Sequence, residues 1–234
     1  MIRPGLLVSL LFPPRCPVCG TVIPPKAGLC EDCRLSLSRE LKPLPLCPHC
    51  GKPKPACVCQ LLPAKGIDGC LSAFIYREPT RRLFERFKQG DEPIARQLAA
   101  MMLSRWREGS FPTPDAVIGV PPRPEKFDHV RLLSLPISRA LNIDLLDGLI
   151  FRQQNSRVQH TLSARERWEN ARISYALRPG STAPKRILLI DDIMTTGATL
   201  SSCAHLLREA GADEIYGLTA ATTLSPDSAP SPNP

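Results

Sequence analysis

The feature that most constrains the fold is the stretch RILLIDDIMTTGATL at residues 186–200. After Arg186 it has four consecutive aliphatic residues, which is typical of a parallel strand covered on both faces. Two adjacent acids, Asp191 and Asp192, come next, and a loop of small residues then leads into a helical pattern that ends at Gly211. The run EIYGLTAA at 214–221 indicates a further strand. This order of strand, loop, helix and strand predicts a βαβ unit.

Earlier segments fit the same α/β architecture. DAVIGV at 115–120 indicates another buried strand, and CLSAFIY at 70–76 alternates like an outer strand. Two amphipathic helices are predicted, at 80–90 and 94–106. We therefore expect a parallel sheet flanked by helices over residues 67–224. The Pro- and Ser-rich tail at 225–234 is expected to be disordered.

The acid pair and the loop after it suit a sugar phosphate. Parallel sheets bind ligands beyond the carboxyl ends of their strands, where Asp191 and Asp192 are expected. Adjacent carboxylates repel each other and lose hydration there, so they need a partner such as a vicinal diol or hydrated Mg²⁺. The loop TTGAT at 195–199 offers backbone N–H groups before a helix, which favours an anion. A diol beside a phosphate describes ribose 5-phosphate; the alternative is a capped helix with incidental acids.

This stretch resembles the signature that binds phosphoribosyl pyrophosphate (PRPP) in type I phosphoribosyltransferases. The resemblance implies that Asp191 and Asp192 hold the ribose hydroxyls and stabilise charge on the ring, with Mg²⁺ bound alongside PRPP. It also implies that the 5′-phosphate is held by Thr195, Thr196, Gly197, Ala198 and Thr199. The family's pyrophosphate loop follows an earlier strand, and VPPR at 120–123 occupies the corresponding place. Arg123 then contacts pyrophosphate, although Pro121-Pro122 fits a rigid turn equally well.

The N-terminal region predicts a metal-binding module over residues 1–66. Eight of the ten cysteines lie before residue 60. CPVCG and CPHCG are knuckle-like motifs that point two thiolates at one metal, and CEDC and CVC supply second pairs. Sequential pairing gives one or two four-cysteine zinc sites, with the sets Cys16, Cys19, Cys30, Cys33 and Cys47, Cys50, Cys57, Cys59. An interleaved arrangement is the alternative, and a disulfide framework would need an oxidising compartment. His49 is interpreted as a bystander.

Charge and hydropathy bear on partners and location. The net charge of +8 suits a polyanionic partner or a phosphorylated ligand, but an inert basic surface fits it as well. The apolar stretch at 5–12 is too short to cross a bilayer. We therefore expect a cytoplasmic protein with no membrane span.

A Cys-rich module joined to a PRPP-type domain resembles the ComF family, also called GntX-like, of DNA-uptake and DNA-utilisation proteins. The resemblance extends from Cys16 to about Leu224. Further matching positions lie in the segment 152–172, namely Gln159, Leu162, Arg167 and Asn170. One departure is that the family's Arg-Gly-Phe-Asn-Gln run is replaced here by KFDHVRLL at 126–133.

The resemblance implies a protein that binds PRPP–Mg²⁺ and DNA, single- or double-stranded, and acts with competence or DNA-processing proteins. Two alternatives are a true phosphoribosyltransferase acting on a base or small acceptor, and a zinc-dependent adaptor with a vestigial pocket. A basic stretch is expected to contact DNA phosphates, formed by Arg77, Arg81, Arg82, Arg86 and Lys88. The segment 152–172 fits an Arg-bearing flap or a plain exposed helix. Trp106 and Trp168 fit base stacking or packing.

Overall fold

The computed structural model describes residues 13–39, 46–47, 49–57, 59, 66–78, 80–153 and 174–224 of the 234-residue chain. Several predictions concern residues outside these ranges. They are the apolar stretch 5–12, most of the segment 152–172 with Gln159, Leu162, Arg167, Trp168 and Asn170, and the tail 225–234.

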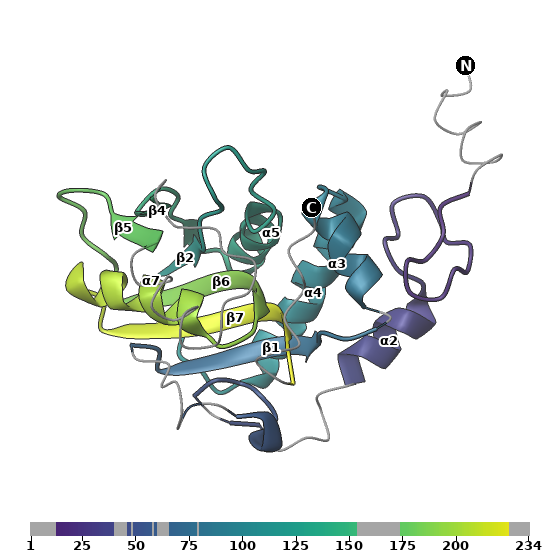
Figure 1. The fold of residues 1–234 in the computed structure, drawn as a ribbon, viewed down its shortest axis with the longest axis horizontal. Coiled ribbons are helices and arrows are strands. Elements are labelled where there is room, and N and C mark those ends of the chain that lie inside the picture. Colours follow the sequence, from purple (N-terminus) through teal and green to yellow (C-terminus); the bar gives the residue numbers. More distant parts are fainter. Residues whose placement is uncertain are drawn as a thin grey trace.

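A five-stranded sheet forms the centre of the molecule, in the order β1-β7-β6-β2-β3 (Figure 1). Every neighbouring pair in it is parallel. The strands are β1 (Gly69–Ile75), β2 (Ala116–Gly119), β3 (Asp144–Leu145), β6 (Arg186–Met194) and β7 (Glu214–Thr222). A separate antiparallel pair is formed by β4 (Ile150–Arg152) and β5 (Tyr175–Leu177). The parallel sheet predicted from the sequence is confirmed, with β1 at its edge as expected.

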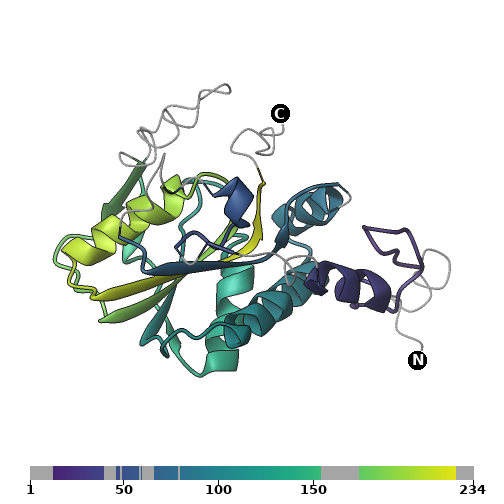
Figure 2. The same ribbon diagram turned by 90° about the horizontal axis from the view of Figure 1, so that it is seen from below.

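Helices cover both faces of the sheet (Figure 2). On one face lie α4 (Glu92–Glu108) and α5 (Arg131–Leu141), and on the other lies α7 (Ala198–Glu209). The aliphatic run in β6 supplies both cores: Leu188 and Ile190 belong to the core under α4 and α5, whereas Ile187 and Leu189 belong to the core under α7. Burial on both faces explains why that run does not alternate with polar residues.

Aspartate side chains accept backbone N–H groups at the starts of two helices. Asp91 precedes α4, and its carboxylate accepts a hydrogen bond from the N–H of Ile94 at 3.2 Å. Asp128 accepts one from the N–H of Arg131 at 2.9 Å at the start of α5. No helix was predicted at α5; Pro136 lies inside it, and a proline normally argues against a helix interior. The shorter helices are α2 (Glu31–Arg39), α3 (Arg81–Lys88) and the 3₁₀ turn η1 (Lys54–Ala56).

The two halves of the Cys-rich region pack in different places (Figure 1). The first half lies against α3 and α4, where the side chain of Gln97 donates to the carbonyl of Ala27 at 2.9 Å. The second half lies against β1, and Cys47 and Cys50 belong to the same core as Cys70. Each half of the Cys-rich region therefore shares a core with residues of the sheet and its helices.

Two further sequence interpretations concern single features. Trp106 is buried and stacks on Phe111 with ring centroids 5.2 Å apart, so of its two interpretations packing is the one observed. In the part of the chain that the structure describes, no helix has the length and apolar character needed to cross a bilayer.

Candidate functional site

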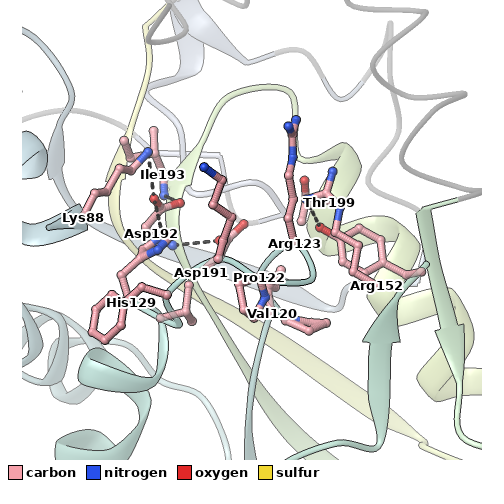
Figure 3. Close-up of a pocket in the computed structure, with 15 residues that line it drawn as sticks. Lys88, Val120, Pro122, Arg123, His129, Arg152, Asp191, Asp192, Ile193 and Thr199 are labelled. Atoms are coloured by element: carbon pink, nitrogen blue, oxygen red, sulfur yellow. Dashed lines mark hydrogen bonds and ion pairs between the residues drawn. The ribbon is translucent and has the colours of Figure 1, made fainter. Parts of the chain in front are cut away.

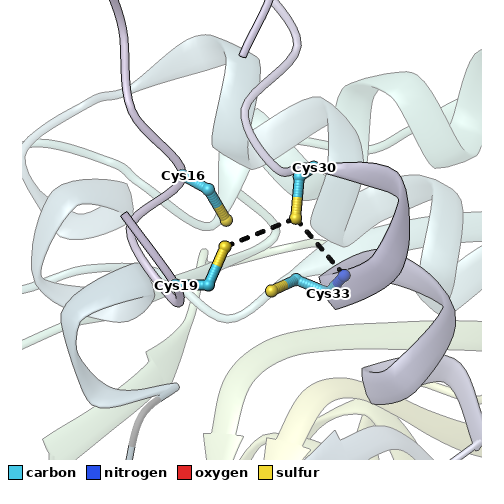
Figure 4. Close-up of side chains that lie close together, drawn as sticks. All are labelled: Cys16, Cys19, Cys30 and Cys33. Carbon is cyan, nitrogen blue, oxygen red and sulfur yellow. Dashed lines mark hydrogen bonds between the residues drawn. The ribbon is translucent and has the colours of Figure 1, made fainter. Parts of the chain in front are cut away.

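The eight N-terminal cysteines form two separate clusters in sequential order. One contains Cys16, Cys19, Cys30 and Cys33, and the other contains Cys47, Cys50, Cys57 and Cys59. Within each cluster the four sulfur atoms lie within 4.8 Å of one another, and Figure 4 shows those of the first cluster turned toward a common centre. The interleaved arrangement is not observed, and His49 is exposed and belongs to neither cluster. All ten cysteines are free, so the disulfide alternative does not hold.

The sulfur spacing fits tetrahedral zinc. Four sulfurs that each lie about 2.3 Å from a tetrahedral zinc ion are about 3.8 Å from one another. The separation between Cys19 and Cys30 is 3.6 Å, that between Cys47 and Cys59 is 3.9 Å, and that between Cys50 and Cys57 is 3.8 Å. Bound zinc would fix the geometry of each knuckle and so stabilise the fold around it.

The acid pair lies where β6 extends past its neighbour β2. The last contacts between the two strands are the pairing of Gly119 with Ile190 and the hydrogen bond from the N–H of Val120 to Ile190 at 2.8 Å. Pro121 and Pro122 follow Val120, and because prolines lack an N–H the ladder cannot continue. Pairing between β6 and β7 continues to Met194, so the strand is longer than the predicted 186–190. The residues from 191 onward therefore have no β2 partner, and Asp191, Asp192 and Ile193 border a cavity.

This cavity has a volume of about 440 Å³ and brings together four of the predicted site residues, Arg123, Asp191, Asp192 and Thr199. Its rim is rich in cations. Lys88, Lys126, His129 and Arg152 also line it, so basic side chains outnumber the two acids. In Figure 3, Lys88 and His129 approach Asp192 from one side, and Arg152 lies near Thr199 on the other.

Asp192 is held by two side chains that the sequence did not assign to the site. Its Oδ2 atom lies 3.1 Å from Nζ of Lys88 and 3.1 Å from Nε2 of His129. Its Oδ1 atom accepts the N–H of Ile193 at 2.6 Å. Asp191 accepts the N–H of Asp192 at 2.9 Å through Oδ1. Both acids are thus oriented before any ligand binds. The histidine in KFDHVRLL was the available sequence signal for this contact.

The two carboxyls differ in protonation. Burial raises the pKa of Asp191 well above its usual range, and the charge of Asp192 raises it further. Burial acts in the same direction on Asp192, but the hydrogen bond from His129 and the charge of Lys88 outweigh it and hold the pKa of Asp192 below its usual range. The pKa values of the two carboxyls are therefore shifted in opposite directions, so that Asp192 ionises before Asp191 and the repulsion between them is limited.

The loop TTGAT at 195–199, called the hydroxyl loop for its three threonines, leads into the start of α7. Gly197 has φ +79°, a left-handed conformation that favours glycine, and Oγ1 of Thr196 accepts the N–H of Ala198 at 3.3 Å. Thr195 and Thr199 are half-buried, whereas Thr196, Gly197 and Ala198 are buried. Thr199 lines the cavity directly, and the other four residues lie next to it along the chain. The free N–H groups of a helix start give this loop the chemistry of an anion site.

The basic stretch on and before α3 is less free than the sequence suggested. Arg86 pairs with Asp91, and Arg81 pairs with Glu85 at 3.4 Å. Lys88 lines the cavity and pairs with Asp192. Arg82 is exposed on α3.

The segment KFDHVRLL, which replaces the family run, makes two local contacts. Asp128 stands where the run has Asn and accepts the N–H of Arg131, and His129 stands where the run has Gln and contacts Asp192. Phe127 keeps the aromatic position, is 55% exposed, and lies against Gly90, where an added Cβ would be 3.3 Å from its ring.

Comparisons with known proteins agree with this architecture. A family model described as a double zinc ribbon domain matches residues 7–66, and one described as a phosphoribosyl transferase domain matches residues 132–227. The chain is therefore a double zinc ribbon followed by a phosphoribosyltransferase-type domain.

Relatives narrow this class to one family. The chain is 31% identical over 226 residues to competence protein F of Haemophilus influenzae, covering 88% of this chain and 97% of the relative. It is 29% identical to competence protein ComFC of Streptococcus pneumoniae, covering 80% and 84%. It is 27% identical to the DNA utilization protein YhgH of Escherichia coli strain K12, covering 86% of each. The chain belongs to the ComF family.

Proposed function

We propose that this protein binds PRPP with Mg²⁺ in the cavity beside β6 and acts on nucleic acid in the uptake or use of DNA. One observation carries the proposal. Asp191 and Asp192 border the same cavity as Thr199 at the start of α7, while cationic side chains surround them. A ligand that matches this arrangement carries a diol for the acids and several phosphate oxygens for the cations and the helix start.

Each group has a role in this proposal. The acids accept hydrogen bonds from the ribose hydroxyls, and the loop 195–199 holds the 5′-phosphate. Arg123 and Lys126 lie on the strand-connecting loop after β2, where they face the pyrophosphate. Mg²⁺ would neutralise phosphate charge, and carboxylate oxygens such as those of Asp191 are the ligands it prefers, directly or through water.

Two observations support the nucleic acid part. Relatives over most of the chain are named for competence and for DNA utilization. The net charge of +8 favours a polyanion, and Arg82 offers an exposed cation on α3. Competence or DNA-processing proteins are the protein partners consistent with those names, and such a role would place the protein in the cytoplasm.

A second candidate function is transfer of the phosphoribosyl group to an acceptor. The observation that favours it is the position of Arg123 in the same cavity as Asp191 and Asp192. In that reaction the bond between the anomeric carbon and pyrophosphate breaks, and positive charge develops on the ring. Asp192, already ionised, would stabilise that charge. Release of pyrophosphate from PRPP, measured with bases, small acceptors and DNA, tests this function.

The test of PRPP binding is a calorimetric titration of PRPP–Mg²⁺ into the zinc-loaded protein. The variant Asp191→Asn/Asp192→Asn should bind at least about tenfold more weakly, because it loses charge-assisted hydrogen bonds to the diol. Asp213→Asn removes a carboxylate that is 65% exposed and pairs with Lys185, so it should bind like the wild type. Equal affinity of the double variant and the wild type would argue against the proposal.

A further inference from the structure

Lys52 is the starting point, because a lysine is rarely buried without a reason. It lies in the second Cys-rich half, two residues after Cys50, and its side chain is 0% exposed. Its Nζ atom donates to the carbonyl of Thr223 at 2.7 Å and lies 3.3 Å from the hydroxyl of the same residue. We call the parts of the Cys-rich region that hold the first and second cysteine clusters the first and the second ribbon. Lys52 therefore joins the second ribbon to the end of β7, across 171 residues of sequence.

Thr223 is in turn bonded to the residue that precedes the hydroxyl loop. Its N–H donates to the carbonyl of Met194 at 3.1 Å, and the hydroxyl of Thr222 donates to the same carbonyl at 3.2 Å. Met194 is the last residue of β6, and Thr195 opens the loop. An unbroken set of hydrogen bonds thus runs from Lys52 through Thr223 to the base of the loop.

Packing contacts also connect the second ribbon with the loop 195–199. Gly51 lies so close to β1 that an added Cβ would be 2.3 Å from the carbonyl oxygen of Cys70. The sulfur of Cys70 lies 3.8 Å from the sulfur of Met194. An added Cβ at Gly197 would meet that same Met194 sulfur at 4.0 Å. Met194 therefore lies between the second ribbon and the loop in both sets of contacts.

Charge explains why a lysine fits this place. A zinc ion with four thiolates has a net charge of −2, and a buried charge needs a nearby counter-charge. Burial lowers the pKa of Lys52 to about 8, whereas the negative charges of Cys50, Cys57 and Cys59 act in the opposite direction and favour the charged ammonium. Zinc in the second cluster would therefore keep the Lys52 side chain where it reaches Thr223.

The first ribbon has other neighbours. Its Ala27 contacts Gln97 of α4, and the guanidinium of Arg86 in α3 donates to the carbonyl of Arg15 at 3.4 Å. Its buried residues belong to the core under α4 and α5, whereas Cys47 and Cys50 belong to the core that contains Met194. The two clusters thus have the same set of four cysteines but pack against different parts of the sheet domain.

We infer that the second zinc ribbon holds the loop 195–199 in place, with Lys52 as the positioning residue that connects them. The effect on ligand affinity rests on the proposed function, because it assumes that this loop binds phosphate. The effect on the loop itself does not depend on any ligand.

The test is hydrogen–deuterium exchange of the full chain, loaded with zinc, in three variants. Cys59→Ser weakens the second cluster, Cys19→Ser weakens the first, and Lys52→Met removes the ammonium while keeping most of the apolar stem. Zinc content is measured for each variant, and a peptide within α5 reports on general loss of structure. We expect faster exchange in the peptide that spans 194–200 for Cys59→Ser and Lys52→Met, and wild-type exchange there for Cys19→Ser.

The same variants are then titrated with PRPP–Mg²⁺. If the second ribbon holds the loop 195–199 in place, PRPP–Mg²⁺ should bind about twofold to thirtyfold more weakly to Cys59→Ser and to Lys52→Met. Its affinity for Cys19→Ser should change little. Wild-type exchange of the loop in the first two variants, or equal acceleration in all three, would overturn the inference. Absence of PRPP binding by the wild type would instead count against the proposed function and leave the exchange result to decide the inference.

Discussion

The Gly197→Ala substitution separates the backbone role of the hydroxyl loop from its proposed role in binding phosphate. Gly197 has φ +79°, and an added Cβ would meet only the sulfur of Met194, at 4.0 Å, among the described residues. The methyl group therefore fits the empty protein without a clash. Its cost to folding is the cost of holding alanine in the left-handed region, about 1–2 kcal/mol.

That cost lowers the melting temperature by a few degrees, since about 1 kcal/mol corresponds to about 2–4 °C for a chain of this size. A bound phosphate would change the result. The methyl group would then occupy the space in which the phosphate approaches the backbone N–H groups. Loss of one charge-assisted hydrogen bond, about 1.5–3 kcal/mol, weakens binding by about tenfold to 150-fold.

Gly180→Ala is the matched control. Gly180 has φ +75°, and no atom of the residues that the structure describes lies within 4 Å of an added Cβ, so it carries the same backbone cost away from the site. Thermal melting of both variants and calorimetric titration with PRPP–Mg²⁺ make the comparison. Both should melt at similarly lowered temperatures, and Gly197→Ala alone should bind weakly. Tight binding by Gly197→Ala, or equal weakening in both variants, would refute the role assigned to the loop.

Three further predictions concern the site and its surroundings. PRPP binding should release a proton from Asp191, because the raised pKa of this carboxyl falls when hydroxyls donate to it, and affinity should therefore rise with pH between the usual and the raised pKa. Calorimetric titration in two buffers of different ionisation enthalpy should show proton release by the wild type and none by Asp191→Asn. Equal proton release by the two proteins would contradict this prediction. Asp128→Ala should cost about 1 kcal/mol through loss of the hydrogen bond from the N–H of Arg131, whereas Asp128→Asn should melt like the wild type; equal melting of the two variants would show that this hydrogen bond contributes nothing. Arg82→Ala should reduce the salt dependence of single-stranded DNA binding by about 0.7 in the slope of log K against log salt, and an unchanged slope would remove Arg82 from the DNA surface.

Local sequence patterns predicted most of the fold. The aliphatic run of β6, the acids after it and the glycine-containing start of α7 are contiguous, so their relation to one another is set by chain geometry. The cysteine knuckles are equally local, and each contributes its own pair of sulfurs to a cluster. The helix α5 was not predicted; Pro136 lies inside it, where a proline weakens a helical pattern.

The contacts that complete the site are long-range and leave little trace in the sequence. Lys88 and His129 reach Asp192 from segments 104 and 63 residues away in the chain, by subtraction of their numbers. Lys88 was interpreted as part of a DNA-binding stripe because its neighbours on the helix are basic. Lys52 had no signal at all, since a lysine after a knuckle is normally exposed. Only the packing of the sheet brings these residues to the acids and the loop.

The most direct test of the central claim compares ribose 5-phosphate with 2-deoxyribose 5-phosphate on the wild type and on Asp191→Asn/Asp192→Asn. If the acids hold the ribose hydroxyls, the wild type should bind the deoxy sugar about tenfold or more weakly, because one charge-assisted hydrogen bond is lost. The double variant should bind both sugars with nearly equal affinity. Equal discrimination by the wild type and the variant would show that the acids do not contact the sugar and would contradict the account.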